Sequence, residues 1–279
     1  MGSFIDLHIH SVYSDGSLTP EQIVLAASEL GLYAIAITDH DSTEGIIPAV
    51  EFSAAFPVKV VPGVELSCAA GAREIHLLGY NIDPRSEELN SALEYVAMLR
   101  NERNSTVCSL LRKEGVDISM NDLRERFGSH MITMTNFAIY LVEKGYAEDK
   151  RDAYKRYIGI NAPCRIPKYK IPLETAARLI KNAGGCSVVA HPVQYRMSDD
   201  EYMEFFVYCK SLGIGGIEAI YSANTKEDEE KFKAMAKRSG MFITGGSDYH
   251  GDLKPGINIG TGTGDLKVPG SILKNIGFE

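Results

Sequence analysis

Short apolar runs alternate with amphipathic stretches toward both ends of the chain, whereas its middle has a different pattern. Apolar runs of this length predict buried strands, and apolar residues that recur every three or four positions predict helices. Seven strands are expected, at 4–10, 33–38, 58–66, 74–80, 186–190, 216–221 and 241–245. Helices are expected between them, at 19–30, 43–56, 172–183, 201–212 and 226–239. This alternation predicts an α/β fold with a closed or nearly closed barrel.

One connection interrupts the alternation of strands and helices. The segment between the third and fourth expected strands extends only from Ser67 to Arg73. A crossover between parallel strands needs roughly ten or more residues. These two strands are therefore predicted to form a hairpin within an otherwise parallel sheet.

The middle of the chain has a helical pattern throughout. Leu89, Leu93 and Val96 begin a helical repeat, and further helices are expected at 121–127, 135–144 and 150–158. We interpret this region as an all-helical subdomain inserted into a discontinuous barrel domain. The expected boundaries are 87–166 for the insertion, and 1–86 with 167–279 for the barrel.

Composition narrows the possible classes of protein. Of the 279 residues, 44% are hydrophobic and 24% are charged, which is typical of a globular protein. The net charge of -8 and the lack of a dense basic run argue against a broad surface for duplex DNA. The five cysteines form no Cys-X-X-Cys pair, and neither a signal peptide nor a membrane-length apolar run is visible. We expect a cytoplasmic protein without a membrane or an obligate protein partner.

Imidazole and carboxylate side chains collect at the predicted strand ends. In α/β barrels, the active site lies at the carboxyl ends of the strands. His8 and His10 are two residues apart on the first strand, so they project from the same face. The candidate metal ligands are His8, His10, Asp15, His40, Glu65, His76, His191, Asp248 and His250.

Each of these motifs is a weak signal when it stands alone. A His-X-His strand, an Asp-His turn or an Ala-His-Pro turn can hold ordinary hydrogen-bonded or capping residues. Their joint placement favours a metal site. Nine nitrogen and oxygen ligands exceed the needs of one ion, so two or three divalent ions (Mn, Fe, Zn or Mg) are expected. His130, which lies in the helical segment without such neighbours, is expected to be a solvated side chain.

In these motifs the sequence resembles the PHP (polymerase and histidinol phosphatase) family of metal-dependent phosphoesterases. The matching stretches begin at Asp6 (DLHIHS), Ser14 (SDG), Ile37 (ITDHD), Gly63 (GVE), Ile75 (IHLLGY), Val189 (VAHP) and Gly246 (GSDYHG). The resemblance implies a distorted seven-stranded, TIM-like β/α barrel with three metal ions, in which Glu65 bridges and a bridging hydroxide attacks phosphorus. The implied ligand sets are His8, His10, Glu65 and Asp248; Glu65, His76 and His191; and Asp15, His40 and His250.

The helical insertion resembles one branch of that family, which acts on nucleoside monophosphates, on 3′,5′-bisphosphonucleotides or on RNA. The similar stretches begin at Leu141 (LVEKGY), Tyr157 (YIG) and Pro167 (PK). The resemblance implies substrate-binding roles for Arg100, Arg103 and Lys168, although a solvated helix face explains Arg100 and Arg103 equally well. Arg165 is a further candidate, because together with Lys168 it could replace phosphate donors that the branch has and this chain lacks. The branch commonly has an Arg-Pro-His stretch where this chain has Met134 and Asn136, which puts the substrate in doubt.

Hydrolysis of a small phosphomonoester, with nucleotides as the first class to test, is the leading functional hypothesis. A 5′-to-3′ exoribonuclease acting on short RNA ends is an alternative, and it would need a narrow basic cleft with Arg196 among its candidates. An amidohydrolase-type enzyme would need a bridging lysine near a strand end, whereas Lys59 begins a strand. A non-catalytic metal-binding module would predict an incomplete ligand set.

Overall fold

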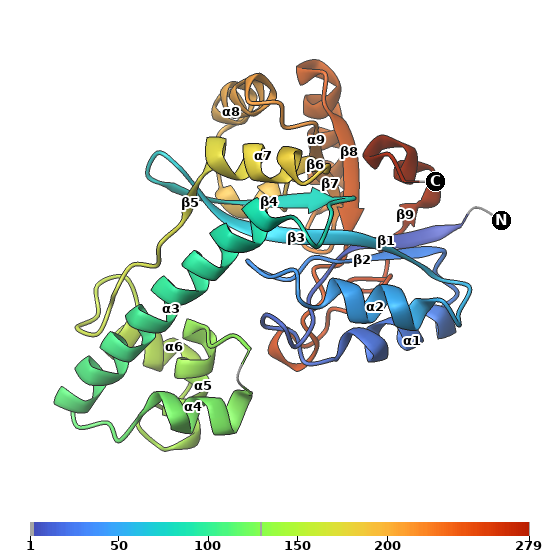
Figure 1. The fold of residues 1–279 in the computed structure, drawn as a ribbon. Helices are drawn as coiled ribbons and strands as arrows, with labels where there is room; N and C mark the ends of the chain where they lie inside the picture. The colour runs from blue at the N-terminus through green and yellow to red at the C-terminus, as the bar shows by residue number, and fades with distance from the viewer. Residues whose placement is uncertain (1–2, 129, 279) are drawn as a thin grey trace. The chain divides into compact units, whose positions relative to one another are not determined.

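The barrel part of the chain is built on one mixed sheet, seen in a computed structural model that describes residues 3–128 and 130–278 (Figure 1). In the described residues the strand order is β8-β7-β6-β4-β3-β2-β1-β9, and β5 pairs with β3. The strands are β1 (Phe4–Ile9), β2 (Ala34–Ile37), β3 (Lys59–Ala70), β4 (Arg73–Tyr80), β5 (Ile171–Pro172), β6 (Cys186–Val189), β7 (Gly216–Tyr221), β8 (Phe242–Gly246) and β9 (Val268–Pro269).

The two ends of the sheet nearly close on each other. Past the end of β8, the amide of Asp248 donates to the carbonyl of His8 at 2.8 Å. The amide of His10 donates to the carbonyl of Tyr249 at 2.9 Å, and Ile9 forms a parallel bridge with Tyr249. The expectation of a distorted β/α barrel is therefore confirmed. The two-residue strands β5 and β9 were not predicted, because two residues carry no periodicity.

The predicted hairpin is also confirmed. Strands β3 and β4 are antiparallel and continue to Ala70 and from Arg73, so only two residues connect them. Gly71 has a φ of 59°, a left-handed conformation that suits glycine in a tight turn. Both strands are longer than expected, and Glu65 consequently lies within β3 rather than near its end.

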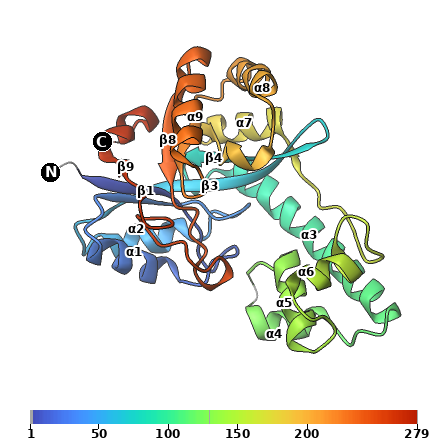
Figure 2. The ribbon, with the colours of Figure 1, turned by 180° about the vertical axis from the view of Figure 1, so that it is seen from behind.

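Helices pack on the outside of the barrel sheet. They are α1 (Pro20–Glu29), α2 (Ile46–Ser53), α7 (Leu173–Asn182), α8 (Asp199–Ser211) and α9 (Lys226–Ser239), with 3-10 turns η2 (Pro192–Tyr195), η3 (Gly251–Leu253) and η4 (Gly270–Ile276). Helix α9 packs against β7 and β8, and both views show it beside β8 (Figures 1 and 2). Helix α2 starts later than predicted, since the Thr43 hydroxyl donates to Asn90 Oδ1 instead of capping the helix.

The chain divides into two compact units, Met1–Leu93 with Lys170–Glu279, and Glu94–Tyr169. The second unit contains most of α3 (Glu87–Lys113), and α4 (Met120–Phe127), α5 (Met134–Glu143), α6 (Lys150–Ala153) and the π-helical turn η1 (Tyr154–Ile158). Its own apolar core includes Leu111, Phe137 and Leu141, which are fully buried. The domain boundaries at 87 and 166 stay a prediction.

The barrel unit has apolar clusters on both sides of its sheet. One includes Ile5 and Leu7 of β1 and is covered by Ile272 and Ile276 of η4. Burial of such side chains stabilises the folded state by about 1.5–3 kcal/mol each, and it keeps the strands that carry the polar site rigid. None of the described helices is both long and apolar enough to cross a membrane.

Candidate metal centre

The structure brings together all nine candidate ligands, which come from six strands or the loops after them. His8, Glu65 and His76 lie on β1, β3 and β4, and the others lie in the loops after β1, β2, β6 and β8. Four groups of these residues have ligand atoms within 4.8 Å of one another. The groups are His10, Asp15, His40 and His250; His8, Glu65 and His191; His8, His10 and Asp248; and His40, Glu65 and His76.

Glu65 lies at the centre of the cluster. One carboxylate oxygen, Oε1, is 3.0 Å from His76 Nδ1 and 2.9 Å from His191 Nε2. The other, Oε2, is 2.9 Å from His40 Nδ1 and 3.3 Å from His10 Nε2. A fully buried carboxylate in contact with several imidazoles fits the bridging role that the family resemblance implies.

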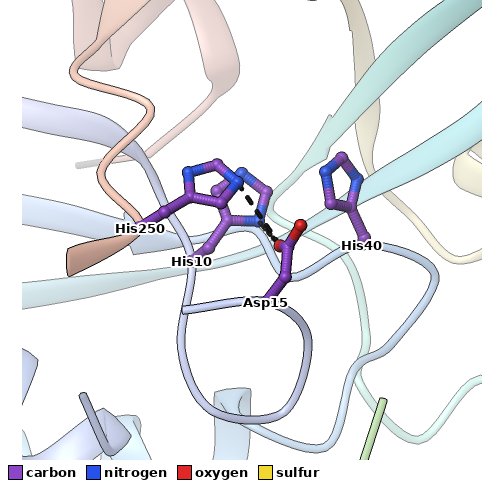
Figure 3. A group of neighbouring side chains, drawn as sticks. All are labelled: His10, Asp15, His40 and His250. Atoms are coloured by element: carbon purple, nitrogen blue, oxygen red, sulfur yellow. Dashed lines mark ion pairs between the residues drawn. The ribbon is translucent and has the colours of Figure 1, made fainter. Parts of the chain in front are cut away.

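A second group of ligands converges on Asp15 (Figure 3). Asp15 Oδ1 is 3.3 Å from His250 Nε2 and 3.8 Å from His10 Nδ1. The rings of His10 and His250 are stacked with their centroids 4.0 Å apart, and His40 faces the same carboxylate from the other side. The resemblance implied that Asp15, His40 and His250 form one ligand set; the structure adds His10 to this group.

Several buried atoms in this cluster lack a hydrogen-bond partner. They are Asp15 Oδ1, His40 Nδ1, Glu65 Oε2 and His191 Nδ1. An unsatisfied buried polar atom costs about 1–3 kcal/mol, so four within one cluster need an explanation. Carboxylate oxygens and imidazole nitrogens are the donors that Zn, Mn and Fe accept, and divalent cations would satisfy the two carboxylates and His40. The donor set therefore fits bound metal ions.

Electrostatics keeps the carboxylates of this cluster charged. Burial alone would raise the pKa of Glu65, but the charges of His40 and His76 hold it well below its usual range. Burial is likewise outweighed at Asp248, where His8 and other neighbours lower the pKa of the carboxyl. Burial lowers the pKa of His10, and nearby His250 and His40 lower it further. The charged carboxylates and the neutral ring of His10 are in the protonation states that bind metals. Burial would also lower the pKa of His8, but Glu218, Glu65 and Asp248 raise it well above its usual range.

Two of the candidate ligands have unusual backbone conformations. His191 has a φ of 25° and Asp248 a φ of 57°, in the left-handed region that favours glycine. Such residues cost of order 1–3 kcal/mol each and cluster at functional sites, where surrounding contacts hold them. The strain at both positions therefore calls for supporting side chains.

Asp248 is supported by two residues that the sequence analysis did not single out. Its Oδ2 accepts hydrogen bonds from the Tyr221 hydroxyl and the Lys254 ammonium, both at 2.8 Å. Its Oδ1 is left facing His10 Nε2 and His250 Nδ1, each at 3.3 Å. The carboxylate thus presents one oxygen to the ligand cluster.

The loop that carries Asp15 is held by another overlooked carboxylate, Asp39. Asp39 accepts hydrogen bonds from the Ser11 amide and hydroxyl, at 2.7 and 2.6 Å, and from the Ser14 hydroxyl at 2.5 Å. Burial raises the pKa of Asp39, and the serine hydrogen bonds oppose that effect. The sequence alone does not distinguish this supporting role from metal binding, because an acidic residue next to His40 could equally be a metal ligand. The folded loop shows that Asp39 binds Ser11 and Ser14 instead.

A third overlooked residue, Glu218, had a readable signal in the sequence. It is a lone charged residue in the apolar stretch 216–221, which was predicted to be a buried strand. Its exposed fraction is 0%. It lies 2.9 Å from His8 Nδ1, so it contacts the ligand cluster without belonging to it.

The predicted substrate-binding residues lie in the helical unit. Arg103 is only 9% exposed, and its buried Nε has no hydrogen-bond partner. Burial, together with the charges of Arg100 and Arg165, lowers the pKa of Arg103 to about 10. Lys168 is half-buried in the same unit. A buried guanidinium that is repelled by two further arginines is an arrangement that an anion would stabilise.

The remaining sequence positions have ordinary structural surroundings. Asn136 is buried, and its Oδ1 accepts from the Thr133 amide at 2.7 Å as part of the cap of α5. Met134 packs against the core of the helical unit. His130 is exposed and belongs to none of the four described ligand groups. The ammonium of Lys59, at the start of β3, lies 5.3 Å from the centroid of the Tyr33 ring.

Comparison with known proteins identifies the family. Residues 6–158 match the PHP domain. The chain belongs to the PHP family. This PHP chain is therefore a metal-dependent phosphoesterase, as the motifs from Asp6 to Gly246 indicated.

Relatives of this PHP chain align along most of its length. The 3′,5′-nucleoside bisphosphate phosphatase of Chromobacterium violaceum is 32% identical, covering 92% of this chain and 90% of the relative. The 5′-3′ exoribonuclease of Haemophilus influenzae is 30% identical, covering 88% of this chain and 89% of the relative. A crystal structure of a Bifidobacterium adolescentis protein, 28% identical, covers 98% of this chain and 95% of that one, with a TM-score of 0.84.

Proposed function

We propose that this PHP protein hydrolyses a phosphate monoester of a small substrate, with nucleotides as the first class. The observation that carries this proposal is the cluster of nine side chains, which contact one another and leave buried carboxylate and imidazole atoms without hydrogen-bond partners. A relative that acts on nucleoside bisphosphates, 32% identical over 92% of the chain, supports the substrate class.

The nine ligands would hold two or three divalent ions, with Glu65 bridging. Bound ions would activate water and neutralise the charge that develops on a phosphoryl group. The protein's own part is to hold the ligands in place. Tyr221 and Lys254 fix Asp248 through Oδ2, and Asp39 fixes the loop that carries Asp15. Such supporting contacts set ligand orientation and typically matter about 10- to 100-fold for metal affinity or activity.

We propose that Arg100, Arg103, Arg165 and Lys168 bind an anionic part of the substrate. The argument rests on Arg103, a buried guanidinium whose electrostatic neighbours include two further arginines. Guanidinium groups suit phosphate because they present paired donors in one plane. The Arg-Pro-His stretch of the branch is replaced here, and Asn136 is used as a helix cap. The donor set for the leaving group would therefore differ from that of the branch.

A 5′-to-3′ exoribonuclease is the second candidate function. It is favoured by one observation, the 30% identity to the Haemophilus influenzae exoribonuclease over 88% of this chain. An amidohydrolase-type site is less well supported, because Glu65 occupies the centre of the cluster and Lys59 lies over the Tyr33 ring. The five cysteines carry free thiols, which supports a reducing compartment such as the cytoplasm.

A screen of phosphate release tests the proposal. The protein would be assayed with Mn²⁺, Mg²⁺, Zn²⁺ and Fe²⁺ on p-nitrophenyl phosphate, nucleoside monophosphates, 3′,5′-bisphosphonucleotides and a 5′-phosphorylated RNA pentamer. The expected result is metal-dependent release of inorganic phosphate from nucleotides. Release of mononucleotides from the pentamer without phosphate release from mononucleotides would favour the exoribonuclease. Inactivity on every phosphoester with every metal would refute both.

A further inference from the structure

Strand β7 supplies none of the nine candidate ligands, yet one of its side chains reaches two of them. Glu218 is completely buried. Its Oε1 lies 2.9 Å from Nδ1 of the His8 ring, and its Oε2 accepts the backbone amide hydrogen of His191 at 2.7 Å. A single carboxylate therefore contacts β1 and the loop after β6, which lie far apart in the sequence.

The contact with His8 determines which ring nitrogen carries hydrogen. A carboxylate oxygen only accepts, so Nδ1 of His8 must donate. In the neutral ring, which is the form that binds a metal, Nε2 then has the lone pair, and it lies 3.1 Å from His10 Nε2 and 3.4 Å from Glu65 Oε2. The opposite tautomer would place a hydrogen on Nε2 and block the lone pair that a metal needs.

The contact with His191 holds a strained segment of backbone. With a φ of 25°, His191 stands in a conformation that a residue with a Cβ rarely adopts. Its amide nitrogen is anchored by Glu218, and its ring reaches Glu65 with Nε2 at 2.9 Å. Loss of the anchor would let the backbone relax and move the ring away from Glu65.

We propose that Glu218 is a positioning residue that prepares two candidate ligands at once. It keeps the proton of His8 on Nδ1, and it holds His191 in the conformation that directs its ring at Glu65. The consequence for metal affinity rests on the proposed function. The two hydrogen bonds themselves do not, so they can be tested in the metal-free protein.

The substitution Glu218→Gln distinguishes hydrogen bonding by the carboxylate from mere packing of the side chain. Glutamine has the same shape but only one acceptor, and its amide nitrogen donates. It therefore cannot accept from both His8 Nδ1 and the His191 amide. Either Nδ1 of His8 loses its hydrogen, or the His191 amide loses its hydrogen bond. Glu51→Gln, at an exposed glutamate of α2, is the matched control.

Nitrogen NMR on histidine-labelled, metal-free protein reads out both hydrogen bonds. In the wild type and in Glu51→Gln, we expect Nδ1 of His8 to carry hydrogen and the His191 amide to resist exchange with solvent. In Glu218→Gln, we expect one of these two signatures to disappear. Retention of both would overturn the proposal. An unprotonated Nδ1 in the wild type would overturn it as well, even if the variant failed to fold.

Titration with Mn²⁺ then tests the consequence. We expect Glu218→Gln to bind Mn²⁺ about 10- to 100-fold more weakly than the wild type and Glu51→Gln. Equal affinity in a variant that has lost one hydrogen bond would contradict the positioning role. A wild type that binds no divalent ion would instead refute the proposed function, while the NMR result would still decide the two contacts of Glu218.

Discussion

Two regions of the molecule differ in how buried charges are arranged. One is the ligand cluster of the barrel unit, and the other is the group of Arg100, Arg103 and Arg165 in the helical unit. In the cluster, three carboxylates are interleaved with six histidines, and the pKa of each carboxyl lies well below its usual range. In the arginine group, Arg103 is buried beside Arg100 and Arg165, and burial and repulsion lower its pKa to about 10. One region alternates opposite charges, and the other places like charges close together.

The difference suggests that the two regions need different ligands. The cluster retains carboxylate oxygens and imidazole nitrogens without hydrogen-bond partners, which are donors for cations. The arginine group retains a buried guanidinium nitrogen without a partner, which is a donor for an anion. We therefore expect substitutions in the cluster to abolish catalysis, and substitutions in the arginine group to weaken substrate binding.

The largest effect is expected from His191→Ala. The change removes a ring that contacts Glu65 at 2.9 Å, and with it one candidate metal ligand. Metal ions contribute several kcal/mol to a hydrolytic transition state, so phosphatase activity should fall by about 10³-fold or more. Steady-state rates with Mn²⁺, together with metal content by mass spectrometry, measure the change.

His130→Ala is the matched control for this variant. His130 is exposed, lies in the helical unit and is absent from the described ligand groups. Its substitution should leave both the rate and the metal content within about twofold, as is usual for surface positions. If His130→Ala lost as much activity and metal as His191→Ala, the effect could not be assigned to the ligand cluster, and the contrast between the two regions would be contradicted.

The gathering of the candidate ligands could be predicted because the sequence pattern of each strand also marks where that strand ends. An apolar run that is followed directly by His40 or His191 can be recognised in the sequence. The topology of a barrel then brings the ends of its strands to the same face of the barrel. The partition of the ligands among ions was implied only by the family resemblance. The structure places His10 against Asp15, a proximity that depends on how the loop after β1 folds back. Spacing alone does not specify that loop.

The supporting residues were much harder to predict. Tyr221 and Lys254 meet at one oxygen of Asp248, although they lie on β7 and beyond η3. Their convergence depends on the pairing of β7 with β8 and on the fold of the loop after β8, which are tertiary features. Glu218 was the exception, because an acidic residue in an apolar strand needs a buried partner. Helix α2 and strands β5 and β9 differed from expectation for local reasons, a side-chain contact and short length.

A smaller effect is expected from Arg103→Met, a change that keeps the length and apolar stem of the side chain. The loss of a charged hydrogen bond to substrate costs about 1.5–3 kcal/mol, which lowers kcat/KM by about 10- to 100-fold. The loss should appear mainly in KM, because metal-dependent steps are untouched. Initial rates over a range of concentrations of the best nucleotide substrate separate the two constants.

Arg124→Met, at an exposed position on α4, is the control for loss of positive charge in the same unit. It should leave KM unchanged within about twofold. A fall in kcat alone for Arg103→Met would contradict a binding role. Equal KM values for both variants and the wild type would show that the arginine group does not recognise substrate.

The smallest effect concerns stability, and its sign is the informative part. Burial and the charges of Arg100 and Arg165 lower the pKa of Arg103 to about 10, so folding disfavours its charged form. That cost is fully present below pH 10 and diminishes as the pH rises above 10. Without an anion, Arg103→Met should therefore unfold at the same temperature as the wild type or slightly higher, and the difference should shrink above pH 10. Thermal unfolding followed by circular dichroism measures it.

At neutral pH, inorganic phosphate should make the wild type unfold at a higher temperature than Arg103→Met. An anion that binds only the folded protein at ten times its dissociation constant stabilises by about 1.4 kcal/mol, and only the wild type retains the buried guanidinium. Phosphate should consequently raise the unfolding temperature of the wild type and of Arg124→Met, and leave Arg103→Met unchanged. If phosphate raises all three temperatures equally, the anion binds elsewhere. If Arg103→Met is strongly destabilised without phosphate, the guanidinium has a structural role, and the contrast between the two regions disappears.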